Sequence, residues 1–220
     1  MSPSASGTTS TDRALALRRS RMVDRQLRRR GIRDDRVLAA MGAVKRELFL
    51  PESLRDRAYR DGALPIAEDQ TISQPWIVAR MLELMGLTGP ERVLEGGTGS
   101  GYAAAVLARC AEHVVSVERR PALLRSAAAA LDAAGVRNVE LRVGDGSAGV
   151  AGRAPFDAIC VTASASGGEP PAALRRPLAS GGALVCPVDR DGEEHLAVMR
   201  DGRTEKIASV RFVPLVEGGP

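Results

Sequence analysis

The sequence is poor in aromatic, cysteine and histidine residues. Aromatic residues account for only 3% of the 220 residues, so alanine, valine and leucine must fill most of the core. The three cysteines include no C-x-x-C pair, which predicts buried free thiols rather than a redox or metal site. The two histidines, His113 and His195, have no second ligand type at metal spacing. The sequence therefore predicts neither a metal site nor a histidine-based catalytic triad.

Long hydrophobic runs are also absent. No stretch approaches the roughly 18 apolar residues of a membrane span. Residues 1–11 are rich in serine and threonine and lack the apolar segment of a signal peptide. We therefore expect a cytoplasmic protein in which residues 1–11 form a disordered tail. The remaining residues 12–220 have a length typical of a single domain.

Positive charge is concentrated near the N-terminus. The net charge is +4, and residues 12–30 contain Arg13, Arg18, Arg19, Arg21, Arg25, Arg28, Arg29 and Arg30. Leu15, Met22 and Leu27 supply an apolar side, which indicates an amphipathic helix. The arginines could form a nucleic-acid-binding face. A solvated basic face is the favoured interpretation.

Residues 12–90 are predicted to form N-terminal helices and a substrate loop. Helices are expected at 12–30, 34–44, 51–59 and 75–85, with an irregular stretch at 60–74. Asp34 or Asp35 is a good N-cap, and Pro75 suits a first helical turn. Gly31 and Gly86 are typical of helix ends.

Residues 91–220 are predicted to form an α/β sheet. Strands are expected at 92–96, 113–118, 139–143, 156–162, 183–188 and 196–200, and helices at 102–111 and 121–134. Apolar runs without strict alternation, such as V-V-S-V at 114–117, are typical of a parallel sheet covered on both faces. Asp201-Gly202 predicts an antiparallel hairpin over 200–216. The predicted fold is a mostly parallel, doubly wound sheet with an antiparallel C-terminal hairpin and N-terminal helices.

The most informative motif follows the strand at 92–96. The run E-G-G-T-G-S-G-Y at 95–102 brings backbone N–H groups close to a ligand at the start of a helix. Its spacing is G-x-G-x-G, and Tyr102 stands where a dinucleotide-binding fingerprint needs a third glycine. Glu95 would repel a pyrophosphate but tolerate a cationic ligand, so the loop favours S-adenosylmethionine over NAD. A plain strand-to-helix turn is the alternative.

Two acidic residues end the following strands. Glu118 comes about 20 residues after the glycines, where a carboxylate accepts ribose hydroxyls. Asp145, in G-D-G at 144–146, is placed to accept from an adenine amino group. Both belong to the carboxyl edge of the predicted sheet, where ligands bind. Each alone is also compatible with a strand-end cap or turn residue.

A hydroxyl-rich loop, Q-T-I-S-Q-P at 70–75, enters the helix predicted at 75–85. Ser73 or Gln74 could simply cap that helix. The alternative is that the helix N-terminus and the hydroxyls of Thr71 and Ser73 hold an anionic substrate group.

Together these motifs resemble the protein-L-isoaspartate O-methyltransferase family. The resemblance rests on P-I-A-E-D-Q-T-I-S-Q-P at 65–75, the loop at 94–102, S-V-E at 116–118, G-D-G at 144–146 and R-F-V-P-L at 211–215. It covers about residues 20–216. It implies a Rossmann-like methyltransferase fold, S-adenosylmethionine as methyl donor, and isoaspartyl residues of damaged proteins as substrates. It also implies a cytoplasmic, usually monomeric enzyme.

Position by position, the resemblance implies site residues of three kinds and no metal ligand. Ser73 matches the family's active-site serine. The cofactor-binding positions are Gln70, Thr71, Ile72, Ser73, Glu95, Gly97, Thr98, Gly99, Ser100, Gly101, Tyr102, Glu118, Arg119, Asp145 and Gly146. The substrate-binding positions are Thr71, Ser73, Trp76, Arg211, Val213 and Pro214.

The sequence departs from the family pattern at three places. Gly96 stands where Ile or Val is usual, which predicts looser packing under the glycine loop. Trp76 replaces a more usual Tyr, and S-A-S-G-G at 164–168 predicts a more flexible turn after the fourth strand.

The implied reaction is in-line methyl transfer from a sulfonium to a carboxylate. A carboxylate is already ionised at neutral pH, so no strong general base is needed. The enzyme must instead supply alignment and remove water. Ser73 is expected to hold the carboxylate, and the loop at 70–74 to cover the methyl donor.

Three other functions compete with isoaspartyl repair. A peptide-tailoring relative would methylate an ordinary aspartate of a dedicated precursor, but such relatives usually carry an extra C-terminal segment. A nucleic-acid methyltransferase would explain the basic first helix, but residues 162–165 lack the Asn-Pro-Pro-Tyr type of loop used for amino groups. A catalytically silent binding module would not need the intact T-I-S-Q-P loop.

Overall fold

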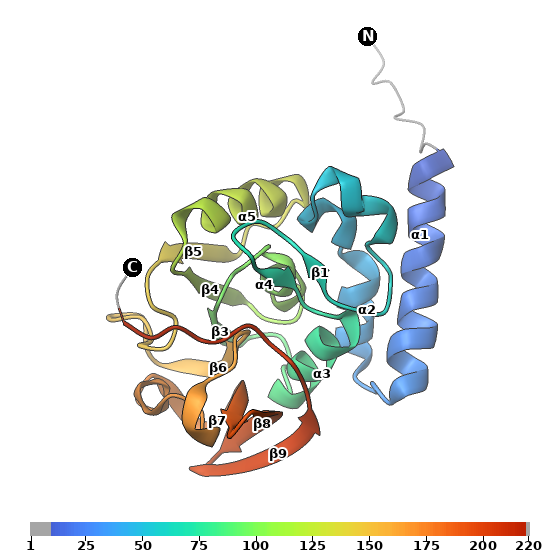
Figure 1. Ribbon diagram of the computed structural model, residues 1–220. Coiled ribbons are helices and arrows are strands. Elements are labelled where there is room, and N and C mark those ends of the chain that lie inside the picture. The colour runs from blue at the N-terminus through green and yellow to red at the C-terminus, as the bar shows by residue number, and fades with distance from the viewer. Residues whose placement is uncertain (1–9, 219–220) are drawn as a thin grey trace.

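A seven-stranded sheet forms the centre of the chain in the computed structural model, which describes residues 10–218 (Figure 1). The strand order is β5-β4-β3-β6-β7-β8-β9. The strands are β3 (Arg92–Gly96), β4 (His113–Glu118), β5 (Val139–Val143), β6 (Phe156–Val161), β7 (Leu178–Arg190), β8 (Glu193–Arg200) and β9 (Arg203–Ser209). Strands β3 to β7 pair in parallel, whereas β8 and β9 pair antiparallel. The predicted α/β class is confirmed.

The strands β7 and β8 are longer than the sequence predicts. They continue beyond the expected ranges into a tight hairpin at Asp191-Gly192. Both turn residues have a positive φ, 59° for Asp191 and 84° for Gly192. An Asp-Gly pair adopts this conformation readily because glycine has no Cβ. The sequence-based prediction recognised only the second such pair, Asp201-Gly202, which does connect β8 to β9.

The second strand of the predicted C-terminal hairpin ends early. The strand β9 stops at Ser209, the Val210 N–H still donates to the Glu194 carbonyl of β8 at 3.0 Å, and the chain then crosses to the end of β6. There the Ser164 N–H donates to the Val213 carbonyl at 2.8 Å, and the Leu215 N–H donates to the Ser164 carbonyl at 2.8 Å. The C-terminal segment therefore reaches the carboxyl edge of the parallel strands.

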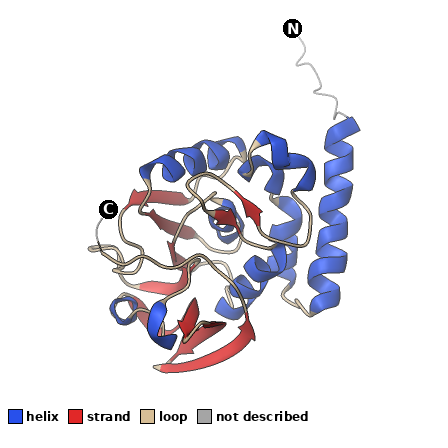
Figure 2. Cartoon of the chain, viewed as in Figure 1, coloured by secondary structure: helices blue, strands red, loops and turns tan. Residues whose placement is uncertain are grey.

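Within residues 10–218 there are five α-helices, which lie around the sheet and in the N-terminal part of the chain (Figure 2). They are α1 (Ser10–Met22), α2 (Asp35–Ala43), α3 (Pro75–Met85), α4 (Tyr102–Leu107) and α5 (Pro121–Ala133). Asp34 caps α2 by accepting from two backbone N–H groups, and left-handed Gly86 ends α3, as predicted. A short antiparallel pair, β1 (Leu64–Pro65) and β2 (Thr71–Ile72), lies in the stretch expected to be irregular.

Several helix predictions need correction. The segment expected as one helix over 12–30 becomes a π-helical turn at Val23–Leu27 and then a 3-10 turn. The π turn brings Met22 and Leu27, five positions apart, onto one buried side. The segment 51–59 forms only a 3-10 helix, and α4 stops at Leu107. The 3-10 segments are Arg28–Arg30, Arg46–Phe49, Glu52–Arg57, Ser166–Gly168 and Ala172–Arg175.

Ser10 and Thr11, which the sequence predicts to belong to a disordered tail, are part of α1. Residues 1–9, also assigned to the tail, lie outside the described residues. Within residues 10–218, no helix combines the length and apolar character needed to cross a bilayer.

The core consists of two apolar clusters on opposite faces of the sheet. Neighbouring residues on β3 illustrate the division, since Val93 belongs to one cluster and Leu94 to the other. The larger cluster includes residues of α2, α3 and α4. The smaller one includes Leu174 from the segment between β6 and β7. The cysteines are buried and free, as predicted.

Candidate active site

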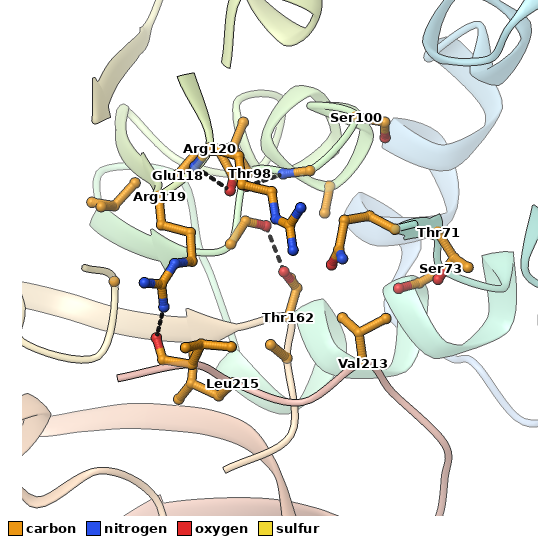
Figure 3. A pocket seen from close by; sticks show the side chains of 18 of the residues that line it. Thr71, Ser73, Thr98, Ser100, Glu118, Arg119, Arg120, Thr162, Val213 and Leu215 are labelled. Atoms are coloured by element: carbon orange, nitrogen blue, oxygen red, sulfur yellow. Dashed lines mark hydrogen bonds between the residues drawn. The ribbon is translucent and has the colours of Figure 1, made fainter. Parts of the chain in front are cut away.

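A cavity of about 260 Å³ lies at the carboxyl edge of the parallel strands (Figure 3). Its walls come from the loops after β2, β3, β4, β5 and β6 and from the C-terminal segment. In the close view, Thr71 and Ser73 lie at one end, Glu118 and Arg119 at the other, and Thr162 between them. The structure thus brings together loops that are far apart in the sequence. The predicted site residues along the cavity are Gln70, Thr71, Ile72, Ser73, Gly97, Thr98, Gly99, Ser100, Tyr102, Glu118, Arg119, Asp145, Gly146, Val213 and Pro214.

In the glycine loop after β3, the backbone conformation at position 97 requires glycine. Its φ is +94°, and a Cβ there would stand 2.6 Å from Thr162 Oγ1. The same hydroxyl donates to the Gly97 carbonyl at 2.5 Å, so Thr162, which directly follows β6, holds the loop in place. The loop leads directly into α4, whose N-terminal end faces the cavity through Ser100 and Tyr102. This is the backbone arrangement expected for a bound nucleoside-bearing cofactor.

Glu118 is fixed at the end of β4 by two backbone donors. Its Oε2 accepts from the Gly99 N–H at 2.9 Å, and its Oε1 accepts from the Arg120 N–H at 3.0 Å. The carboxylate is therefore bonded directly to the glycine loop on the cavity wall. Its remaining lone pairs suit a ribose diol, which needs acceptors.

Asp145 is held in the loop after β5. Its Oδ1 accepts from the backbone N–H and the hydroxyl of Ser147, and its Oδ2 accepts from the Gly218 N–H at 2.7 Å. Partial burial would raise the pKa of this carboxyl, but the hydrogen bonds and nearby Arg119 lower it overall. Arg119 in turn donates to the Val216 carbonyl at 2.6 Å. The C-terminal segment thus covers the end of the cavity expected to hold adenine.

The opposite end is formed by β2 and the start of α3. Gln74 is the N-cap of α3 but makes no side-chain capping bond. Within residues 10–218 the Ser73 hydroxyl has no hydrogen-bond partner, so it does not cap the helix either. Ser73 is half-buried, on the cavity wall, beside a helix N-terminus. This geometry favours the anion-holding interpretation of the loop over simple capping.

A second hollow of about 380 Å³ adjoins the first. The two share Thr71, Ser73, Thr162 and Val213. Arg211 lines the second hollow and not the first. A ligand in one space and a ligand in the other would therefore meet at Ser73.

Glu95 does not reach the cavity, contrary to its predicted role beside the cofactor. It is completely buried under the glycine loop and hydrogen-bonded to Ser116, which also contacts Thr98. Burial raises the pKa of Glu95 to about 8, and the negative charge of Glu118 adds to the rise against the Ser116 hydrogen bond. The carboxyl is therefore protonated at neutral pH and supplies no charge to attract a sulfonium.

Two other predicted site residues lie elsewhere. Gly101 starts α4 with a φ of +84°, and a Cβ there would stand 3.1 Å from the Ala127 Cβ, so this glycine serves helix packing. Trp76 lies on the outer side of α3, where its ring contacts the Arg30 guanidinium at 5.0 Å. Ser73 lies before α3, whereas Trp76 belongs to its first turn, so the two side chains need not face the same way despite their short separation in the sequence.

Gly96 does not loosen the packing below the loop. A Cβ at Gly96 would stand 3.1 Å from the Gly146 carbonyl oxygen, and a Cβ at Gly146 would stand 2.6 Å from the Gly96 Cα. The two backbones fill the space that a side chain would otherwise occupy. The turn at 164–168 is likewise held, because the Ala165 N–H donates to the Pro187 carbonyl at 2.9 Å.

The sequence-based prediction missed Asp69, Arg120, Thr162 and Ala163 on the cavity wall. Thr162 could have been found, because it follows β6 at the same edge of the sheet as Gly97. Arg120 is bound to Glu68 at 3.2 Å, a contact between loops that no local pattern indicates. Among residues 10–218, no group of three His, Cys, Asp or Glu side chains is placed to hold a metal ion.

The chain is similar to known proteins over nearly all of its length. The family model described as protein-L-isoaspartate(D-aspartate) O-methyltransferase matches residues 17–219. Protein-L-isoaspartate O-methyltransferase 1 of Rhodopseudomonas palustris (strain HaA2) is 53% identical over 209 residues, which cover 92% of this chain and 84% of that protein. Protein-L-isoaspartate O-methyltransferase of Roseiflexus sp. (strain RS-1) is 50% identical over 204 residues, covering 91% and 92%.

Solved structures share the fold over most of the chain. A protein-L-isoaspartate O-methyltransferase superposes with a TM-score of 0.78 at 29% identity, covering 91% of this chain and 66% of that longer one. A Plasmodium falciparum protein described as a protein-L-isoaspartate O-methyltransferase, in complex with S-adenosyl-L-homocysteine, gives a TM-score of 0.78 at 26% identity, covering 91% and 99%. The chain belongs to the protein-L-isoaspartate(D-aspartate) O-methyltransferase family.

Proposed function

We propose that this protein transfers a methyl group from S-adenosylmethionine to the free carboxylate of L-isoaspartyl residues in damaged proteins or peptides. The observation that carries the proposal is the convergence of the Ser73 loop and the glycine loop on two adjoining spaces. The cavity bounded by Gly97, Glu118 and Asp145 suits the cofactor. The hollow beside Arg211 suits the peptide.

The residues fit the cofactor in chemical type. Glu118 and Asp145 offer carboxylate acceptors for ribose hydroxyls and an adenine amino group, and the bare backbone at Gly97 and Gly99 permits close approach. When bound, S-adenosylmethionine supplies an electrophilic methyl group on a sulfonium. The family structure in complex with S-adenosyl-L-homocysteine supports the same donor.

Ser73 and the start of α3 hold and orient the substrate carboxylate in this proposal. The Ser73 hydroxyl is free to donate, and the positive end of the helix dipole favours an anion beside it. An isoaspartyl carboxylate is ionised at neutral pH, so no side chain needs to remove a proton. The chain's task is to align the carboxylate and exclude water.

The methyl ester formed in this way is activated toward its own backbone. The neighbouring amide nitrogen attacks the ester carbonyl, and methanol leaves as a succinimide forms. Water then opens the ring, partly to ordinary aspartate. These steps need no group from the protein, so repair begins with the single transfer described above.

A pair of peptides tests the proposal. One carries an isoaspartyl residue and the other an ordinary aspartyl residue at the same place, and methyl transfer from labelled S-adenosylmethionine is measured for both. The proposal predicts transfer to the isoaspartyl peptide only. Transfer to the aspartyl peptide alone would favour the tailoring alternative.

A nucleic-acid substrate has less support. Several arginines of the basic N-terminal segment are engaged with acidic side chains, as in the pairs Arg29–Asp24 at 3.1 Å and Arg30–Asp61 at 2.9 Å. Base methylation that is lost as salt rises would support that alternative. The cytoplasmic location and the monomeric state stay predictions, which fractionation and light scattering would test.

A further inference from the structure

A chain of contacts links the N-terminal segment to the substrate loop. Arg30 Nη1 donates to both carboxylate oxygens of Asp61, at 2.9 and 3.1 Å. Gln74 Nε2 donates to Asp61 Oδ1 at 2.6 Å. Gln74 directly follows Ser73 and lines the hollow assigned to the peptide. The link therefore ends at the substrate side of the site.

Trp76 contacts Arg30, the first residue of this chain of contacts. The Arg30 guanidinium carbon lies 5.0 Å from the centre of the Trp76 ring. The Trp76 Nε1–H also donates to the Arg30 carbonyl at 3.3 Å. Arg30 is thus held by both its side chain and its backbone. This gives a structural role to a tryptophan that departs from the family pattern and does not reach the cavity.

The carboxylate of Asp61 fixes the orientation of the Gln74 amide. An ionised carboxylate only accepts hydrogen bonds, so the NH2 end of the amide must face it. The carbonyl oxygen, Oε1, is then directed away from Asp61. Within residues 10–218 this oxygen has no hydrogen-bond partner. A free acceptor on the wall of a peptide-sized hollow suits a backbone N–H of the substrate.

The ion pair itself contributes little to folding. The side chains of Arg30 and Asp61 are 41% and 44% exposed, and solvent weakens pairs of this kind. Orientation of Gln74 is the effect that remains.

We propose that Asp61 is a positioning residue for peptide binding, which holds Gln74 so that its Oε1 accepts a backbone N–H of the isoaspartyl substrate. Arg30, packed on Trp76, keeps Asp61 in place. The inference rests on the proposed function and names a determinant of peptide affinity within it.

Steady-state kinetics with an isoaspartyl peptide test the proposal. We compare Asp61→Ala, Asp61→Asn, Gln74→Met and the double variant Asp61→Ala/Gln74→Met with the wild type. Asp132→Ala is the matched control, because it removes a similar exposed pair, Arg137–Asp132 at 2.8 Å, from α5. The readouts are kcat, KM for the peptide, KM for S-adenosylmethionine, and the melting temperature.

Loss of one hydrogen bond to the peptide should raise its KM about three- to tenfold in Asp61→Ala and Gln74→Met. We expect kcat and the cofactor KM to stay within twofold. Asp61→Asn should raise the peptide KM less, since an amide still accepts from Gln74 but also permits the reversed orientation. The double variant should match Gln74→Met alone, because Asp61 acts through Gln74.

An unchanged peptide KM in Asp61→Ala would overturn the inference. The inference would also be overturned if the increases in peptide KM of the two single variants multiplied in the double variant. A loss of kcat and of cofactor affinity together with a lower melting temperature would overturn it as well, because it would show a general loss of structure. In each case the wild type still methylates the isoaspartyl peptide. A wild type that leaves this peptide unmethylated would instead remove the proposed function, and this inference with it.

Fluorescence of Trp76, the single tryptophan of the chain, gives a readout besides activity. Asp61→Ala releases Arg30 from its partner, so the emission of Trp76 should shift relative to the wild type. The control Asp132→Ala should leave the emission unchanged. Identical spectra for the wild type and Asp61→Ala would contradict the coupling between Asp61, Arg30 and Trp76.

Discussion

Replacing Glu95 by glutamine should change how the stability of the protein depends on pH. Glu95 is completely buried under the glycine loop, and its Oε1 has no hydrogen-bond partner within residues 10–218. Burial raises its pKa from 4.5 to about 8. Between these values the folded protein keeps a proton that the unfolded chain has lost. The contribution of protonated Glu95 to the free energy of unfolding is therefore fully present below about pH 4.5 and is lost as the pH rises through about 8.

The size of the effect follows from the linkage of folding to one proton. Each pH unit between the two pKa values costs the folded state about 1.4 kcal/mol. From pH 6 to 7.5 the free energy of unfolding should fall by about 2 kcal/mol, and the melting temperature by about 4–8 °C for a chain of this size. Glutamine has nearly the same shape as glutamic acid but does not titrate. The free energy of unfolding of Glu95→Gln should therefore not show this fall with pH.

Thermal unfolding of the wild type and Glu95→Gln over pH 6–9 measures the effect. The difference between the two melting temperatures removes contributions from all other titrating groups. Glu205→Gln, at an exposed position on β9, is the control and should follow the wild type throughout. Parallel curves for the wild type and Glu95→Gln would refute the protonated, buried state of Glu95.

Two further predictions concern the cofactor cavity. Gly97→Ala should weaken the binding of S-adenosylhomocysteine, measured by calorimetry, about tenfold or more. An L-residue at a φ of +94° costs roughly 1–2 kcal/mol, and its Cβ would displace Thr162. The control Gly62→Ala, whose Cβ would meet nothing within 4 Å, should bind normally. Asp145→Ala should raise the cofactor KM about three- to tenfold by removing an acceptor for the adenine amino group, with kcat unchanged at saturating cofactor. A lower kcat at saturation would show that Asp145 acts in methyl transfer and not only in binding.

The central sheet could be predicted because its signals are local. The predicted ranges of β3, β4 and β5 match the observed strands residue for residue. Asp34 marks a helix start through its capping side chain, and Pro75 and Gly86 mark a helix start and end through their backbone preferences. The glycine loop and the acids after β4 and β5 followed from the same logic, because parallel strands end at one edge.

The remaining errors came from contacts between distant segments. Glu95 looked like a ligand because it adjoins the glycines, yet strand alternation buries it against Ser116 on β4. The segment after β9 has the composition of a strand, but Val213 and Leu215 form backbone hydrogen bonds with Ser164 and not with β8. The close contact of Gly96 with Gly146 joins two loops 50 residues apart, and no local pattern reveals it.

The role of Ser73 is the most direct test of the whole account. We would measure the initial rate of methyl transfer to an isoaspartyl peptide by the wild type and by Ser73→Ala, at saturating S-adenosylmethionine. Loss of a hydrogen bond to a charged carboxylate should lower kcat about 10- to 100-fold, with the affinity for S-adenosylhomocysteine within twofold of the wild type. Equal rates for the two proteins would contradict the assignment of this cleft as the place where carboxylate and methyl donor meet.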